Sequence, residues 1–142
     1  MKKTNRTYEF AKMYYDWVCD CLTKDEKFEE LAFFKLGVDL AVRQKELIDI
    51  KFSQVEFTCV KDIEVKKMSK NITHPSYYPP RDITRNTYNL LKKLQENNNS
   101  DKIFNKSSQD YIASIIESIG DGSFNGHIMR RLGTTLRFME NN

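Results

Sequence analysis

The chain has 142 residues, the length of one ordinary domain, which is enough to bury a core without disulfides or a structural metal. Charged residues make up 30% of it and hydrophobic residues 39%, with five glycines and three prolines, a mixture that favours helices over a β-sandwich or a β-barrel. The formal net charge of +3 is too small to indicate a partner by itself. We therefore expect a single all-α domain over residues 1–142.

The cysteines and the hydropathy pattern indicate in which cellular compartment the protein is expected. Cys19, Cys21 and Cys59 are odd in number and do not form a disulfide framework. Residues 1–10 include basic side chains but no apolar run, unlike a signal peptide, and no stretch has the length needed to cross a bilayer. These features predict a cytoplasmic protein without a membrane partner. The high usage of lysine, asparagine and isoleucine is typical of AT-rich genomes, such as those of many bacteria, phages and viruses.

The first predicted helix spans residues 4–23 and is rich in aromatic side chains. Phe10, Tyr14 and Trp17 lie on one side of it, and Tyr15 belongs to a second patch. Such aromatic density indicates either a core face or a surface that another subunit covers. An oligomer is therefore one of the expected states.

The most informative segment, from about 26 to 50, is apolar around most of its circumference when it is drawn as a helix. Its polar stripe consists of Lys35, Asp39 and Arg43 at four-residue spacing, and their alternating signs suit mutual pairing. Gly37 costs a helix up to about 1 kcal/mol relative to alanine, so we expect another helix to cross closely there. A helix of this kind must be surrounded. It is predicted to be the central element of the domain.

The segment 52–66 is compatible with two structures. Phe52, Val55 and Cys59 follow helical spacing, whereas Val55, Phe57 and Cys59 alternate as they would in a strand. We interpret the segment as a helix, with a short β-hairpin within the same residues as the alternative.

Three more helices are predicted after a proline-bounded loop at residues 69–82. The first begins at Asp82 or Thr84 and ends near residue 95. The second opens at Ser107, which resembles the start of a capping box, and ends at Gly120. The last spans Phe124–Met139. The predicted fold is a compact bundle of five or six helices around the central one.

The middle of the chain is basic and contains the first candidate binding surface. Residues 51–106 hold eleven bases and six acids, a net charge of +5. In the loop, Tyr77 and Tyr78 precede two prolines, which hold the backbone extended, and exposed tyrosines can stack on bases or anchor an interface. With Arg81 and Arg85 they form the predicted surface. The alternative is a connector whose tyrosines fold back onto the bundle.

The outer face of the last helix is the second candidate. It combines three arginines with polar residues at spacings of three and four: His127, Arg130, Arg131, Thr134 and Arg137. Guanidinium groups bind phosphates or carboxylates in a bidentate manner. The nearby Glu140 cannot neutralise three arginines, so the face should be electropositive. The alternative is an ordinary solvated face of an amphipathic helix.

One pattern favours an enzyme. Glu64 and Lys66, with Asp49 upstream, resemble the spacing of PD-(D/E)xK nucleases, in which two acids hold a divalent metal and the lysine supports the attacking water. That geometry requires Glu64 and Lys66 to lie on one face of a strand. The sequence contains no H-E-x-x-H, P-loop or G-x-S-x-G motif. We therefore expect no catalytic residues, no metal and no cofactor.

These observations predict a non-enzymatic helical interaction module: an adaptor, an inhibitor or an accessory subunit that binds a protein partner through its basic and aromatic patches. The first alternative is a small helical subunit of a nucleoprotein complex that binds RNA or single-stranded DNA. The second is a metal-dependent nuclease that uses Asp49, Glu64 and Lys66.

Overall fold

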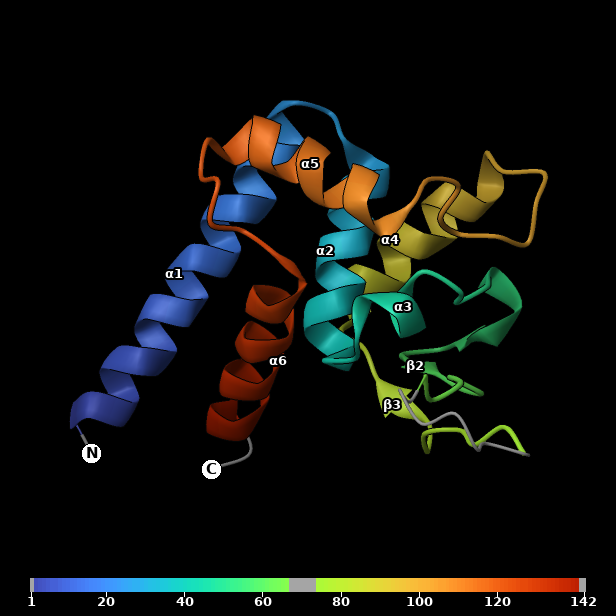
Figure 1. The fold of residues 1–142 in the computed structure, drawn as a ribbon, viewed down its shortest axis with the longest axis horizontal. Helices are drawn as coiled ribbons and strands as arrows, with labels where there is room; N and C mark the ends of the chain where they lie inside the picture. Colours follow the sequence, from blue (N-terminus) through green and yellow to red (C-terminus); the bar gives the residue numbers. More distant parts are fainter. Residues whose placement is uncertain (1, 67–73, 141–142) are drawn as a thin grey trace.

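The computed structural model describes residues 2–66 and 74–140, with side chains described from Thr7 to Arg137. The described part contains six α-helices, one 3₁₀ turn and a small three-stranded sheet (Figure 1). In chain order these are α1 (Lys2–Lys24), α2 (Phe28–Leu40), α3 (Gln44–Leu47), the 3₁₀ turn Phe52–Gln54, β1 (Val55–Glu56), β2 (Cys59–Val60), β3 (Arg81–Asp82), α4 (Arg85–Glu96), α5 (Ser108–Ile119) and α6 (Gly126–Glu140). The predicted all-α class with a short β-hairpin is confirmed.

Helix α2 is the central element, as its apolar circumference predicts. It contacts α1, α4, α5 and α6, and every residue from Glu30 to Val38 is buried (Figure 1). Phe33 stacks on Tyr111 of α5, with ring centroids 4.9 Å apart, and Phe104 packs edge-on against both rings. Burial of large aromatic rings on all sides of one helix supplies much of the apolar free energy of the fold.

The central helix is shorter than predicted, because it ends at Leu40 rather than near residue 50. Ala41 adopts a left-handed conformation (φ 54°), and its amide donates to the Gly37 carbonyl. The freed carbonyl of Leu40 accepts a hydrogen bond of 2.5 Å from the Arg81 guanidinium. A distant arginine thus satisfies the helix end, a contact that a local pattern does not reveal.

The polar stripe of α2 also differs from the prediction. Lys35 Nζ donates to Asn86 Oδ1 of α4 (3.0 Å), and Asp39 accepts from the Thr84 amide (3.0 Å), the N-cap of that helix. Arg43 lies beyond the end of α2. Lys35 and Asp39 therefore join α4 to α2, Arg43 pairs with Glu46, and the predicted mutual pairing is wrong.

The interpretation of 52–66 as a helix was wrong, and the hairpin alternative is confirmed. β1 and β2 pair antiparallel, with Val55 opposite Val60, and β3 joins β2 with Arg81 opposite Val60. Thr58 takes a left-handed conformation in the turn (φ 56°). The third strand is about twenty residues further along the chain, so the local spacing could not reveal it. Residues 67–73, which include the start of the predicted loop, lie outside the described residues.

The ends of α4 and α5 follow the predicted signals. Thr84 is the N-cap of α4, with its hydroxyl accepting from the Thr87 amide, and Ser107 accepts from the Asp110 amide at the start of α5. Gly120 ends α5 in the left-handed conformation (φ 72°), which costs glycine little. Across residues 2–66 and 74–140, no helix is both long and apolar enough to cross a membrane.

Glycines allow α6 to pack closely against α2. A Cβ atom at Gly37 would lie 3.0 Å from Leu47 Cδ2 and 3.1 Å from Met129 Sδ of α6, which confirms the predicted close crossing. A Cβ at Gly133 would overlap the Val38 carbonyl oxygen. These contacts fix the path of α6 across the end of α2, and with it the direction in which the polar face of α6 points.

Candidate nucleic-acid interface

The outer face of α6 is a basic surface. His127, Arg130, Arg131 and Thr134 are exposed, and together with Thr135 they line a shallow depression of about 470 Å³. Within the described part of the chain, the side chains of Arg130 and Arg131 form neither a hydrogen bond nor an ion pair, so both guanidiniums are available to a ligand.

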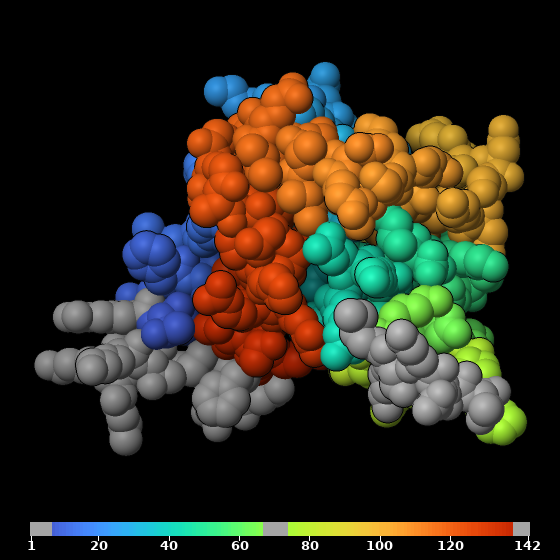
Figure 2. Space-filling model, viewed as in Figure 1, coloured from blue at the N-terminus to red at the C-terminus, as the bar shows by residue number. Residues whose placement is uncertain are grey.

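Helix α3 places a further arginine beside this face. A Cβ at Gly126, the first residue of α6, would lie 2.8 Å from the side chain of Gln44, the first residue of α3, so the two helix starts are in contact. Figure 2 shows the 40–50 segment and α6 side by side on one face. Arg43 precedes Gln44 directly, and its side chain is 47% exposed.

A buried carboxylate organises this corner. The Glu46 side chain is fully buried and accepts hydrogen bonds from three groups: the Arg43 amide (2.9 Å), the Lys66 amide (2.8 Å) and the Tyr78 hydroxyl (3.0 Å). The Arg43 guanidinium also lies 3.5 Å from it. Burial alone would raise the pKa of Glu46, but these hydrogen bonds outweigh burial and hold the pKa below its usual range. Glu46 therefore stays ionised. Its carboxylate links Arg43 to Lys66, which precedes residues 67–73, and to Tyr78, which follows them.

We call the set Arg43, His127, Arg130, Arg131 and Thr134 the α3–α6 basic surface. It comprises the guanidiniums of Arg130 and Arg131 on α6 and that of Arg43, the N-cap of α3, and among the described residues Arg43 pairs with the buried carboxylate of Glu46. Planar guanidiniums match the geometry of phosphate oxygens and remain charged at all relevant pH values. The arrangement is suited to binding a phosphodiester backbone or another multivalent anion.

The predicted Arg137 is separated from the other arginines of α6. Its guanidinium donates to the backbone oxygen of Asp82 (3.4 Å), and it lines a different pocket together with Lys12, Tyr15 and Asp39. The five-residue face predicted on α6 is therefore divided, with Arg137 directed towards β3.

The predicted loop surface is divided as well. Tyr77 is 55% exposed, whereas Tyr78 turns inward to Glu46, so the alternative of a tyrosine folding back onto the bundle applies to Tyr78. Arg81 stacks over the Tyr78 ring at 4.2 Å while it donates to Leu40, and Arg85 lies over the Phe57 ring at 5.5 Å. Tyr78 is thus linked to the α3–α6 basic surface through Glu46, whereas Arg85 contacts Phe57 in the turn between β1 and β2.

Sequence reasoning did not select Arg43 and Glu46 as site residues. Arg43 was assigned to the polar stripe of a long helix, and Glu46 received no role. A signal was nevertheless present, because a glutamate three residues after a helix N-cap is typical of a helix start, and Glu46 stands three residues after Arg43.

The three residues of the nuclease alternative do come together, as an ion-pair cluster. Lys66 Nζ lies 2.6 Å from Glu64 Oε2 and 3.3 Å from Asp49 Oδ2, and all three side chains are partly exposed. The lysine thus occupies the position between the two carboxylates, where a metal would have to bind. In the described ranges, no group of three or more His, Cys, Asp or Glu side chains is placed to hold a metal ion.

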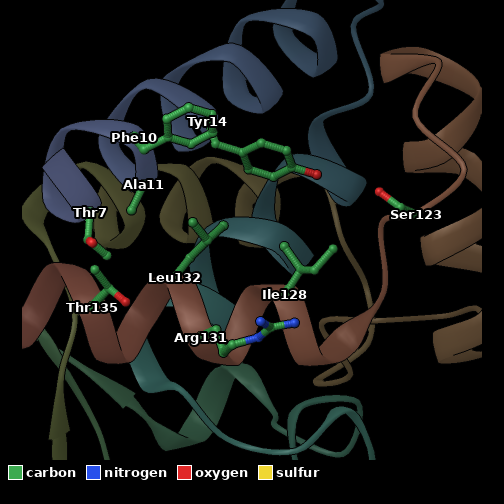
Figure 3. Close-up of a pocket in the computed structure, with 9 residues that line it drawn as sticks. All are labelled: Thr7, Phe10, Ala11, Tyr14, Ser123, Ile128, Arg131, Leu132 and Thr135. Carbon is green, nitrogen blue, oxygen red and sulfur yellow. The ribbon is translucent and has the colours of Figure 1, made fainter. Parts of the chain in front are cut away.

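A larger, mostly apolar groove of about 640 Å³ lies between α1 and α6 (Figure 3). Phe10 and Tyr14 of α1 face Ile128 and Leu132 of α6 across it, and Arg131 lies at its border with the basic surface. Phe10 is 75% exposed, which accords with the aromatic patch expected on this helix. Its lining is less suited to anions than the smaller depression on α6.

No protein-family model matches the chain, and no curated protein matches it. Solved structures of site-specific recombinases do match. The structure of XerA recombinase aligns with a TM-score of 0.66 at 14% identity, over 90% of this chain and 49% of XerA. The pre-cleavage complex of XerH site-specific recombinase bound to its difH substrate aligns with a TM-score of 0.59 at 15% identity, over 89% of this chain and 41% of XerH.

The post-cleavage complex of XerH bound to palindromic difH gives a TM-score of 0.60 at 15% identity, over 89% of this chain and 40% of that one. The chain therefore spans less than half the length of the recombinases that it matches. At 14–15% identity the likeness concerns the fold. The chain has the helical fold of one part of these site-specific recombinases.

Proposed function

We propose that the chain is a DNA-binding helical domain that holds the phosphate backbone of a duplex against the α3–α6 basic surface. The observation that carries the proposal is the exposed face of α6 at Arg130 and Arg131, whose guanidiniums have no partner within the described part of the chain, with Arg43 next to the α3 residue that contacts Gly126. The similarity in fold to XerH, whose structures contain a difH substrate, supports DNA as the anion.

The chemistry of the surface favours backbone contacts over base contacts. Guanidinium groups can each bridge two phosphate oxygens, and the exposed His127 and Thr134 add donors beside them. Contacts of this kind fix the position of a duplex but carry little sequence information. We therefore propose binding that tolerates many sequences within this part of the protein.

The two other functions have weaker support. The interaction module relied on seven residues, namely Tyr77, Tyr78, Arg81, Arg85, Arg130, Arg131 and Arg137, and the side chains of Tyr78, Arg81 and Arg137 make contacts within the fold. The metal-dependent nuclease relied on Asp49, Glu64 and Lys66, and both carboxylates form ion pairs with Lys66. We retain the proposal that this chain has no catalytic activity alone, which its span of less than half of the matched recombinases supports.

A salt titration of duplex binding, followed by fluorescence anisotropy, tests the proposal. Each phosphate neutralised contributes about −0.9 to the slope of log K against log salt, so three guanidinium contacts predict a slope of about −2.7. Affinity should then fall about 40-fold between about 50 and 200 mM salt. A chain that does not bind at the lowest salt, or that binds with a slope near zero, would overturn the proposal.

A further inference from the structure

A cluster of aromatic and cationic side chains lies where the β1–β2 turn meets α4. The Phe57 ring packs edge-on against Tyr88, with centroids 5.3 Å apart, and the Arg85 guanidinium lies 5.5 Å from the Phe57 centroid. Lys92 Nζ lies 5.4 Å from the Tyr88 centroid. We call these four residues the Phe57 cluster.

The exposure of Phe57 is not explained by folding. The residue is 61% exposed at the turn, next to Thr58 in its left-handed conformation. Burying such a side chain removes apolar surface from water and stabilises a fold, so its exposed position gives up stability. A ring held at a turn tip and bordered by cations is suited to contact with something outside the chain.

The cluster carries unneutralised positive charge. Within residues 2–66 and 74–140, neither Arg85 nor Lys92 takes part in an ion pair, and Lys92 donates a hydrogen bond to Gln95 (3.4 Å). The nearby Glu56 is paired with Lys61 at 3.8 Å. The partner should therefore be an anion.

The Phe57 cluster is separate from the α3–α6 basic surface. Helix α2 contacts both α4 and α6, and in Figure 1 it runs between them. A ligand held on α3 and the start of α6 would therefore meet a different side of the molecule from one held on α4.

We propose that the Phe57 cluster binds a single-stranded nucleic-acid segment, with unpaired bases stacked on Phe57 and Tyr88 and phosphates held by Arg85 and Lys92. Single strands present planar bases and backbone charge together, which matches both components of the cluster. A duplex hides its base faces, and an acidic peptide provides charge without a series of rings. This site goes beyond the proposed duplex-binding function and does not depend on it.

The test compares two exposed phenylalanines. Phe57→Ala should weaken the binding of labelled oligothymidylate about tenfold, since stacking is worth about 1–3 kcal/mol per base. Phe10→Ala, which removes the 75% exposed phenylalanine of α1, should leave this affinity unchanged. Duplex affinity should be the same in both variants. Oligouridylate of equal length serves as a second arm that distinguishes RNA from DNA as the preferred strand.

Further variants keep the test decisive. Phe57→Trp should retain the affinity for oligothymidylate, because the larger ring can also stack. Replacing Arg85 and Lys92 together by alanine should reduce the single-strand salt slope by about 1.4, from about 0.7 per phosphate. Equal losses in Phe57→Ala and Phe10→Ala, no binding of either oligonucleotide, or equally tight binding of polyglutamate would overturn the assignment. Loss of duplex binding alone would count against the proposed function and not against this site.

Discussion

Replacing Arg43 and Arg130 together by alanine should lower the affinity for duplex DNA about a hundredfold. Each charge-assisted hydrogen bond contributes about 1.5–3 kcal/mol, which corresponds to at least about tenfold per arginine. The slope of log K against log salt should also become shallower by about 1.8, because two phosphate contacts are lost. Fluorescence anisotropy over a range of salt concentrations measures both effects.

The matched control removes the same net charge from residues outside the α3–α6 basic surface. Lys24 and Lys102 are exposed and form no ion pair in the described part of the chain, so their double alanine variant should bind the duplex nearly as well as the wild type. If both double variants lost affinity equally, the binding would reflect net charge, and the α3–α6 basic surface would have no special role.

Glu46→Gln should destabilise the fold by about 2–3 kcal/mol at neutral pH. The buried carboxylate accepts from the Arg43 and Lys66 amides and the Tyr78 hydroxyl, and an amide cannot accept from all these donors with both of its polar atoms. Duplex affinity should fall as well, because Arg43 loses the group that positions it. Denaturant unfolding and anisotropy measure the two effects.

The same variant should change the pH dependence of stability. The pKa of Glu46 is depressed in the folded state, so its contribution is present above the unfolded pKa of about 4.3 and is lost as the pH falls through the lower folded pKa. The wild type should therefore lose more stability on acidification than Glu46→Gln, and the difference between them should narrow below about pH 4.3.

Asp49→Asn is the control for Glu46→Gln. The Asp49 side chain is 62% exposed and, among the described residues, pairs with Lys66 alone, so its replacement should change stability by less than about 0.5 kcal/mol. If Glu46→Gln destabilised the fold as little as Asp49→Asn, Glu46 would not be the group that organises this corner. The same would follow if the stability of Glu46→Gln depended on pH as that of the wild type does.

Much of the fold followed from local sequence patterns. The apolar circumference of the central helix, the caps at Thr84 and Ser107, and the stop at Gly120 are signals contained in a few neighbouring residues. The close crossing expected from Gly37 was also correct, because a glycine inside a buried helix usually marks the approach of another backbone.

Errors arose where distant residues decide the local structure. The end of α2 depends on Arg81, about forty residues away, and β2 pairs with a third strand well beyond the hairpin. Spacing alone therefore favoured a longer helix and a helical interpretation of 52–66. Neither contact can be inferred from a short stretch of neighbouring residues.

The candidate site was only partly visible in the sequence. Arg130 and Arg131 could be identified because they lie on the polar face of one amphipathic helix. Arg43 could not, since its neighbour Gln44 meets the start of α6 only when α2 ends at Leu40 and α3 packs on Gly126. Arg81 was selected for its charge, although its contacts serve the end of α2.

Mapping amide chemical shifts by NMR while a short duplex is titrated into the protein tests the central claim most directly. The account predicts that the largest changes occur in α3 and in the first half of α6, around Arg43, His127 and Arg130, and that α1 changes little. Changes confined to α1 or α4, with none at the start of α6, would contradict it.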